Sequence, residues 1–309
     1  MKIAVIDMGT NTCNFIIAER DEKKGFHVSC NKKYPVKLGE GGINSGIITG
    51  EAYRRGLDAI SNCMKEIASH NVEKVHVYAT SAVRSARNGE DFVRHVKQVF
   101  NIDMQVIPGE READLIYKGI RQSVKLAQEK VLILDIGGGS NELIIADYNQ
   151  VYWKESIDIG MARVLEYFQP SDPITHEEIS RMEAYFEQNL SNLKYRVMVY
   201  KPMMLIGASG SFETFSSLLM AKEPGLKASN KSKSLQISID DFLKLHSGLL
   251  FTTLEERKKM KGMEMMRVEM IVLASIFVNC VLKITGIKNI IQTDYSLKEG
   301  VVVDLLSLQ

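Results

Sequence analysis

The most informative stretch of this chain is VLILDIGGGSNELIIA, residues 131–146. An aspartate, three glycines and three polar residues separate its two apolar runs, a pattern that predicts a strand, a tight turn and a second strand. The glycines let the backbone turn sharply and present bare N–H groups to a ligand. Asp135 stands where the first strand ends. A carboxylate beside such N–H groups suits Mg²⁺ bound to phosphate oxygens.

The same pattern occurs near the N-terminus, where residues 3–18 read IAVIDMGTNTCNFIIA. At an offset of 128 positions the two stretches share an aspartate, a glycine and an apolar flank: Asp7 aligns with Asp135, Gly9 with Gly137, and 16–18 with 144–146. One Asp-x-Gly match alone would also fit two unrelated β-hairpins. The aligned flanks favour a duplication, and therefore two related domains that each direct a glycine turn toward a shared cleft.

Composition narrows the class of protein. The 309 residues are 45% apolar and 25% charged, which is typical of a globular protein and long enough for two domains. The net charge of +1 predicts neither nucleic acid nor a membrane as a partner. The cysteines form no C-x-x-C pair, which indicates neither a zinc nor a redox motif and favours a reducing, cytoplasmic location.

Two features bear on targeting. The chain begins almost directly with a predicted strand, so we expect no signal peptide. The longest apolar stretch, residues 270–282, is shorter than the roughly 20 residues that a membrane span needs. We therefore predict that it forms a buried helix.

Strand and helix patterns alternate along the chain, which predicts α/β architecture. Besides the two hairpins, the predicted strands are 26–34, 74–79, 104–107, a third strand within 131–157, 203–206 and 289–292. One predicted helix begins after Thr49, another follows residue 211, and a third lies at the C-terminus. The other predicted helices span 91–100, 110–128, 175–195, 240–250, 254–260 and 265–285. Residues 222–234 are predicted to form a surface loop. The best candidate for a domain boundary lies near 119–122.

Polar or glycine turns follow several predicted strands, at 7–12, 80–84, 135–142, 207–211 and 293–296. Ligands of open α/β sheets bind at the carboxyl ends of the strands, so these turns predict one shared site. The turns at 137–139 and 207–210 can bind phosphate oxygens through backbone N–H groups, and the helix after Gly210 adds its dipole. Each turn alone fits ordinary chain reversal, but together they favour a phosphate site.

The charged candidates each have two interpretations. Arg84 could clamp a phosphate or be an exposed loop arginine. The acidic residues at 110–112 begin a helix, where they would ordinarily complement its dipole. Glu142 could hold a metal, orient water or face solvent. The lysines at 222, 227, 231, 233, 258, 259 and 261 fit solvated surfaces better than a track for a polyanion. Scattered histidines suggest no metal site, and Ser209 and Ser211 lack the partners of a serine hydrolase.

At these residues the chain resembles the exopolyphosphatase / guanosine pentaphosphate phosphohydrolase (Ppx/GppA) family, in its short form. This family belongs to the sugar kinase–actin–Hsp70 superfamily. The family's D-I-G-G-G-S is unchanged at 135–140, and its D-x-G-S-N-S, R-L-G-E-G, T-x-A-x-R and G-x-S-G-T motifs are similar to residues 7–12, 37–41, 80–84 and 207–211. Residues 254–257 and 296–300 match further segments. The likeness covers almost the whole chain.

The resemblance implies a fold and a division into domains. The fold is α/β, with two actin-like (ribonuclease H-like) domains of mixed sheets flanked by helices and a cleft between them. Residues 1–120 with 294–309 would form the N-terminal domain, and 121–293 the second domain.

The resemblance also assigns the site. The family's catalytic glutamate falls on Glu112, its phosphate arginine on Arg84, and its metal-linked acids on Asp135 and Glu142. Asp7 is assigned to the metal with them, and the cofactor is Mg²⁺. The phosphate-binding set comprises the three turns: Gly9, Thr10, Asn11, Gly137, Gly138, Gly139, Ser140, Gly207, Ser209, Gly210 and Ser211. Arg111 replaces a family glutamate, and its guanidinium could lower the pKa of Glu112 or bind substrate.

Four functions follow as hypotheses. The first is an exopolyphosphatase that removes terminal phosphate from inorganic polyphosphate, and the second is a guanosine pentaphosphate phosphohydrolase with the same chemistry. The third is an ATP-dependent kinase or ATPase of the same superfamily, and the fourth is a non-hydrolytic sensor of nucleotides or polyphosphate. A homodimer is expected from the family and from the apolar helices late in the chain.

Overall fold

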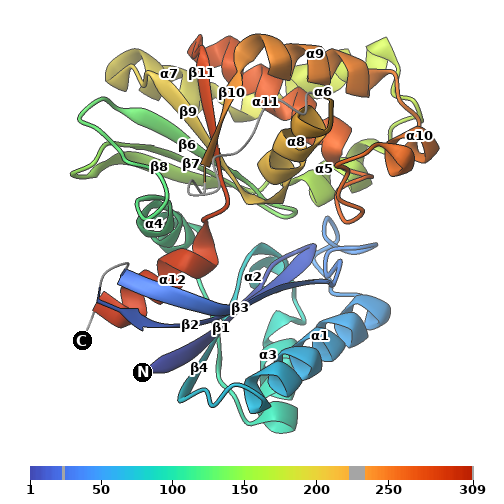
Figure 1. Cartoon of the computed structure of the whole chain (residues 1–309). Helices are drawn as coiled ribbons and strands as arrows, with labels where there is room; N and C mark the ends of the chain where they lie inside the picture. Colours follow the sequence, from blue (N-terminus) through green and yellow to red (C-terminus); the bar gives the residue numbers. More distant parts are fainter. Residues whose placement is uncertain (23–24, 223–233, 308–309) are drawn as a thin grey trace.

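The computed structural model describes residues 1–22, 25–222 and 234–307 (Figure 1). Two β-sheets form separate layers, with helices on both faces of each. The first sheet has the strand order β3-β2-β1-β4-β5, and the second β10-β11-β9-β6-β7-β8. This arrangement confirms the predicted α/β class with mixed sheets and two domains. The limits of the domains at 120, 121, 293 and 294 stay a prediction.

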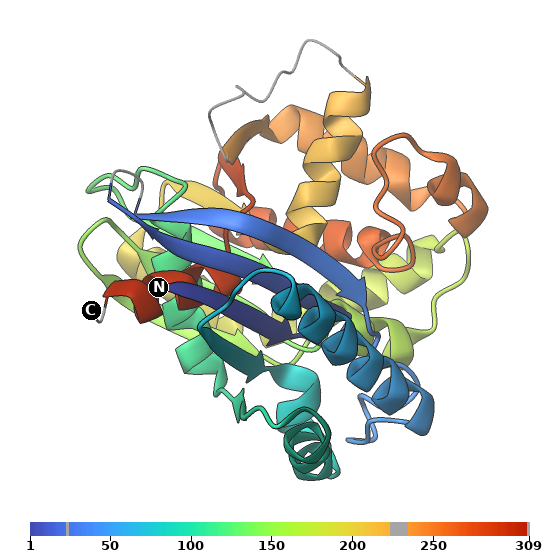
Figure 2. The ribbon, with the colours of Figure 1, turned by 60° about the horizontal axis from the view of Figure 1, so that its bottom comes forward.

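The first sheet is built from the N-terminal third of the chain. β1 (Lys2–Met8) pairs antiparallel with β2 (Thr12–Asp21), which pairs with β3 (Gly25–Pro35). β4 (Lys74–Ala79) and β5 (Met104–Val106) continue the sheet in parallel. The helices α1 (Gly50–Ala68) and α3 (Gly89–Phe100) cover one face (Figure 2).

The second sheet repeats this plan. β6 (Val131–Ile136), β7 (Asn141–Ala146) and β8 (Val151–Ile157) form the antiparallel part, and β9 (Met204–Ala208) and β11 (Asn289–Thr293) continue in parallel. β10 (Ser234–Ser238) adds an edge strand that has no counterpart in the first sheet and that the sequence analysis did not predict. The shared order of strands bears out the duplication inferred from the repeat.

Helices of the second half cover the outer face of the second sheet. These helices are α5 (Met161–Phe168), α6 (His176–Asn189), α7 (Ser191–Tyr200), α8 (Ser209–Lys222), α9 (Ile239–Leu250), α10 (Leu254–Lys259) and α11 (Ile271–Thr285). α11 is buried from Ile271 to Leu282, as predicted for this apolar stretch. No helix among the described residues is both long and apolar enough to cross a bilayer.

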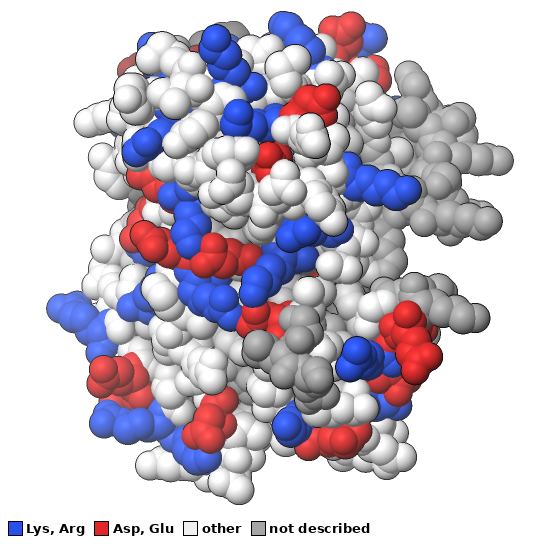
Figure 3. All heavy atoms as spheres, turned by 90° about the vertical axis from the view of Figure 1, so that its left-hand side faces the viewer, with Lys and Arg blue, Asp and Glu red and all other residues white. Residues whose placement is uncertain are grey.

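Two helices lie between the sheets. α4 (Gly109–Ile120) packs against α12 (Leu297–Ser307), and one apolar core joins both helices to the inner faces of both sheets. Because α12 returns to β1 and β2, the two chain ends lie near each other (Figures 1 and 2). A belt of alternating acidic and basic side chains runs across this level of the surface (Figure 3). Lys154 of β8 and Asp114 of α4 form one ion pair between a sheet and these helices, at 2.6 Å.

Several predicted boundaries were wrong. α4 ends at Ile120 rather than near 128, because backbone turns at Gln122 and Ser123 take its last hydrogen bonds. The helix predicted to 195 is interrupted at Leu190, and the one predicted from 265 begins at Ile271. Residues 81–85 form a short helix, α2 (Ser81–Ser85), rather than a loop. Most of the predicted loop at 222–234, with Lys227, Lys231 and Lys233, lies outside the described residues.

Candidate active site

Two glycine turns from different sheets meet face to face between the domains. A Cβ added to Gly138 would lie 2.4 Å from Nδ2 of Asn11, and one added to Gly139 would lie 2.5 Å from both Thr10 Oγ1 and Ser81 Oγ. Such separations are shorter than van der Waals contact, so neither position accepts a larger side chain without movement. The glycines of the β6–β7 turn are therefore required for close approach to the β1–β2 turn.

A cavity of about 90 Å³ lies where these turns meet. Most of the predicted phosphate-binding residues line it: Gly9, Thr10, Asn11, Gly137, Gly138, Gly139, Ser140, Ser209 and Gly210. Gly207 and Ser211 are not in the lining. A Cβ on Gly207 would lie 2.1 Å from the ring of Phe212, so this glycine serves helix packing behind the site. We leave these two residues out of the proposed phosphate-binding set.

The predicted carboxylates converge on the same cavity. Asp7, Glu112, Asp135 and Glu142 all line it, and each is at most 7% exposed. They arrive from the ends of β1 and β6, the start of β7 and the first turn of α4. Residues scattered over 135 positions of sequence thus share one buried space.

Arg84 is the cation nearest to Glu112. Its Nη1 donates to Glu112 Oε2 at 3.0 Å and to the carbonyl oxygen of Ile107 at 2.9 Å, while Nη2 reaches Ser140 Oγ at 3.5 Å. Arg84 lies in α2, beside the cavity rather than in its lining. The guanidinium therefore links the catalytic candidate Glu112 to the glycine turn of the second hairpin.

Burial controls the proton affinity of these acids. Burial, with the charge of Glu142 second, raises the pKa of Glu112 well above its usual range, and Arg84 opposes this rise. Burial and then Asp135 raise the pKa of Glu142 to about 7. Burial likewise raises the pKa of Asp7 to about 6 and that of Asp135 above its ordinary value. Burial therefore disfavours the ionised forms of these acids, and a bound cation would favour them.

Arg111 does not act on Glu112 as the sequence analysis suggested it could. Its guanidinium forms an ion pair with Asp304 of α12, and Lys118 binds the same carboxylate. Arg111 is not in the lining of the cavity. The replacement of a family glutamate by arginine therefore affects the contact between α4 and α12.

The C-terminal segment contributes residues that the sequence analysis missed. Lys298 is 6% exposed, lines the cavity, and binds Glu299 at 2.8 Å. Ser296 Oγ donates to Asp135, and the Ser296 N–H donates to Glu299 Oε2 at 3.0 Å. The polar turn at 293–296 and the match at 296–300 were the available signals. They did not show which side chain would point inward.

Three buried polar atoms at the cavity have no hydrogen-bond partner among the described residues. They are Thr12 Oγ1, Ser81 Oγ and Arg267 Nε, on residues that all line the cavity. Buried polar groups are normally hydrogen-bonded, since an unsatisfied one costs roughly 1–3 kcal/mol. Each of the three can donate to an anionic oxygen, so the site is prepared for a ligand rich in such oxygens.

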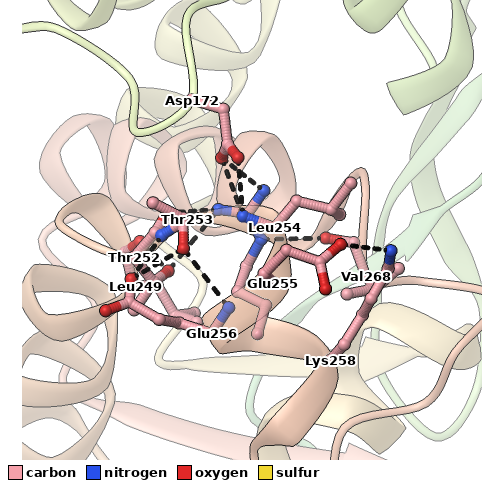
Figure 4. A network of polar contacts seen from close by, with 10 residues as sticks. Asp172, Leu249, Thr252, Thr253, Leu254, Glu255, Glu256, Lys258 and Val268 are labelled. Carbon is pink, nitrogen blue, oxygen red and sulfur yellow. Dashed lines mark hydrogen bonds and ion pairs between the residues drawn. The ribbon is translucent and has the colours of Figure 1, made fainter.

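A polar network anchors the backbone at Val268, the residue after Arg267 (Figure 4). Arg257, 6% exposed, donates through Nε to the carbonyl oxygen of Val268 at 3.0 Å and through Nη2 to Asp172 at 3.2 Å. Asp172 also accepts from the Leu254 N–H at 2.7 Å, and Thr253 caps α10. The segment at 254–257, noted for its family likeness, therefore anchors the turn that carries Arg267 into the cavity.

The carboxylates of the cavity could supply some, but not all, of the ligands of a hard divalent cation. Within the described ranges, no group of three or more His, Cys, Asp or Glu side chains is arranged to hold a metal by itself. Mg²⁺ commonly binds through one or two carboxylates and completes its shell with phosphate oxygens and water. The buried, mutually repelling Asp135 and Glu142, with Asp7 across the cavity, fit that mode of binding.

The chain is similar to known proteins over almost its whole length. The profile of the Ppx/GppA phosphatase family matches residues 16–309. A curated relative from Haemophilus influenzae, described as a putative exopolyphosphatase, is 27% identical over 306 residues, covering 98% of this chain and 91% of the relative.

Solved structures agree as well. A crystal structure of an exopolyphosphatase from Cytophaga hutchinsonii is 37% identical, with a TM-score of 0.96 over 99% of this chain and 98% of that one. The Aquifex aeolicus PPX-GPPA enzyme is 26% identical, with a TM-score of 0.80 over 98% and 99% of the two chains. This chain therefore belongs to the Ppx/GppA phosphatase family and is a phosphoanhydride hydrolase.

Proposed function

We propose that this enzyme is an exopolyphosphatase, which hydrolyses the terminal phosphoanhydride of inorganic polyphosphate and releases orthophosphate. The observation that carries the proposal is the Arg84–Glu112 pair, at 3.0 Å, beside a cavity whose lining includes two glycine turns and the acids Asp7, Asp135 and Glu142. Phosphate oxygens can accept hydrogen bonds from the glycine turns, from the unpaired donors and from the guanidinium. A buried carboxylate can accept a proton from water. The relatives described as exopolyphosphatases support the choice of substrate.

In the proposed reaction, the terminal phosphoryl group lies against the backbone N–H groups of residues 10–11 and 138–140. Glu112 accepts a proton from the attacking water as the water oxygen forms a bond to phosphorus. The bridging P–O bond breaks, and a chain shorter by one phosphate leaves. Arg84 holds Glu112 in place and offsets charge on the transferred group. Phosphoryl transfer relies mainly on such positioning and electrostatics.

Asp135 and Glu142, with Asp7, would hold Mg²⁺ in this proposal. The bound ion would neutralise negative charge on the phosphate oxygens. Its charge would also favour the ionised forms of the surrounding acids, whose pKa values burial raises. Glu112 needs this, because only its carboxylate form accepts a proton.

The experiment that tests the function is phosphate release, with Mg²⁺, from long polyphosphate, tripolyphosphate, guanosine pentaphosphate and ATP. Glu112→Gln is the matched variant, since it keeps the size of the side chain and removes its basicity. We expect turnover to fall by about 10²–10⁴-fold while the fold and substrate binding persist. Near-normal turnover in the variant would remove Glu112 from the role of base.

The same panel separates the alternatives. Release from guanosine pentaphosphate alone would keep the mechanism and change the substrate. Release from ATP without polyphosphate hydrolysis would indicate an ATPase or kinase. Tight binding without any release, in folded protein, would indicate a sensor.

We also propose that the enzyme forms a homodimer. Tyr195, Met198 and Val199 share one side of α7 at helical spacing, and each is more than half exposed, as is Met203 just beyond the helix. Clustered apolar side chains on a surface commonly mark an interface. Light scattering coupled to size exclusion should report twice the chain mass, and Met198→Glu should shift the species to a monomer.

A further inference from the structure

A second polar chamber adjoins the catalytic cavity. It has a volume of about 310 Å³ and shares four lining residues with the cavity: Lys33, Glu213, Asp294 and Lys298. The remaining walls come from α8, the end of β11 and the edge strand β3. The two spaces are therefore neighbours, and their separation lies at these four residues.

The Lys33–Glu213 ion pair is part of that separation. Lys33 lies on β3 of the first sheet and Glu213 on α8 of the second half, so the pair bridges the two domains. Both side chains are about one quarter exposed, at 27% and 23%. Neither residue is held by the backbone of the other domain, so rotation of two side chains would connect the spaces.

The chamber contains an unsatisfied donor of its own. Ser216 lines it, is 2% exposed, and its Oγ has no hydrogen-bond partner among the residues the structure describes. This serine is not in the lining of the catalytic cavity. A buried hydroxyl without a partner is costly, and rotation of this side chain toward the chamber would let an anionic oxygen satisfy it.

The lysines of the chamber are already paired with acids, and Asp294 adds a further carboxylate to its lining. Lys33 is paired with Glu213 and Lys298 with Glu299, while Gln292 Nε2 donates to Asp294 Oδ1 at 2.7 Å. An entering anion must therefore compete with Glu213 for Lys33. A phosphate group can do so, because its several charged oxygens accept from both an ammonium and the Ser216 hydroxyl.

We propose that this chamber is a second phosphate-binding subsite, which opens to the catalytic cavity when Lys33 exchanges Glu213 for a phosphate oxygen. The inference rests on the proposed function in one respect, that phosphate groups reach the cavity. The phosphate in the chamber is either orthophosphate leaving after hydrolysis or a further unit of the substrate chain.

The test measures binding of inorganic phosphate directly, by isothermal titration calorimetry on the full chain. Ser216→Leu places a larger side chain at the chamber. Lys33→Met removes the charge of Lys33, which lies on the edge strand β3, where substitution is tolerated. Lys32→Met is the matched control, because Lys32 is the neighbouring residue and pairs instead with Glu66 at 2.6 Å. We expect wild type and the control to bind a second phosphate that both test variants lose or bind at least tenfold more weakly.

Equal stoichiometry and affinity in wild type and both test variants would overturn the proposal, as would a single phosphate in the wild type. Binding needs no turnover, so a chain that binds the second phosphate but hydrolyses nothing would refute the proposed function and leave the subsite standing. A wild-type chain that binds a single phosphate but hydrolyses polyphosphate fully would refute the subsite and leave the proposed function standing.

Kinetics of the same variants identify the source of the phosphate. If the chamber takes the product, Lys33→Met should weaken inhibition by added orthophosphate, with equal effect for short and long substrates. If it takes the chain, the variant should raise KM for long polyphosphate while KM for tripolyphosphate changes less. Either pattern supports the subsite, and Lys32→Met should show neither.

Discussion

The two glycine hairpins repeat one structural unit, and the difference with most consequence is the residue that faces the aspartate. In both, a backbone bond closes the turn, from Gly9 N–H to the Thr12 carbonyl at 3.0 Å and from Gly137 N–H to the Ser140 carbonyl at 3.1 Å. In both, an aspartate at the end of the first strand faces a residue seven positions later across the ladder. That residue is Asn14 in the first hairpin and Glu142 in the second.

Asn14 and Glu142 therefore have different roles, structural in the first hairpin and chemical in the second. Asn14 Nδ2 donates to Asp7 Oδ2 at 2.8 Å, which stabilises the charged carboxylate and moderates the rise of its pKa. Asp135 and Glu142 instead repel each other, and Ser296 and Ser156 satisfy them only in part. The second hairpin thus holds carboxylates whose charge a bound cation would balance, and Glu142 also lies close enough to Glu112 to raise its pKa.

Glu142→Asn should have the largest effect, because it gives the second hairpin the residue type that the first has at this position. We expect turnover to fall by about 100–1,000-fold, because the second carboxylate of the proposed cation site is lost. Steady-state phosphate release from polyphosphate, over a range of Mg²⁺ concentration, measures this. Unchanged turnover and Mg²⁺ dependence would show that Glu142 is not part of the cation site.

The pH dependence of stability should also distinguish the hairpins. Between the ordinary pKa of 4.5 and the raised value of about 7, folded Glu142 keeps a proton that the unfolded chain has lost. Stability of the metal-free protein should therefore fall as pH rises through this window, by about 3 kcal/mol from this group. Denaturant unfolding of wild type and Glu142→Gln measures it, and the decline in the variant should be smaller by about this amount, with Asp7, Asp135 and Glu112 responsible for the remainder. Parallel curves would assign the decline to other groups.

The reverse exchange puts a second carboxylate into the first hairpin. Asn14→Asp replaces a donor to Asp7 with a like charge, so we expect a destabilisation of roughly 1–3 kcal/mol at neutral pH. Thermal or denaturant unfolding in the absence of metal is the measurement. Asn14→Ala, which removes the donor without adding charge, is the control and should cost less. Equal losses would show that repulsion between the two acids is unimportant.

The smallest expected effect concerns the turns themselves. A Cβ on Gly137 would lie 2.4 Å from the carbonyl oxygen of Ser140, whereas one on Gly9 would lie 2.9 Å from that of Thr12. Gly137→Ala should therefore destabilise the protein more than Gly9→Ala, by about 1 kcal/mol. Paired unfolding curves test this ranking. The opposite order would mean that the second turn relaxes more easily than its closer contact suggests.

Much of the fold was readable from local pattern. The apolar runs at 3–8 and 131–136 and the glycines after them specified strand and turn, and the offset repeat predicted two related domains. Boundaries were less accurate where polar and apolar residues continue the helical pattern past a real end, as beyond Ile120. β10 was missed because its five residues follow a polar stretch and pair only through β11.

The candidate site was readable only in outline. The turns, Arg84 and the acids were identified through motifs, but the motifs carry no distances. Lys298, Lys33 and Glu213 carry no local signal that separates them from surface charges, since each reaches the cavity through the packing of α12, β3 or α8. Arg111 shows the converse, because its sequence position beside Glu112 suggested an influence that its orientation toward Asp304 excludes.

By itself, then, the sequence determined the two hairpins, the family and the chemical types of the reacting groups, because turn geometry and strand alternation depend on residues adjacent in the chain. The tertiary structure decided which groups meet. Arg84 touches Glu112, Gly138 contacts Asn11, and Lys298 enters the space between Asp7 and Glu299, because parallel strand order and the pairing of α4 with α12 bring them there. Burial then sets their charges, and burial is a property of the whole fold.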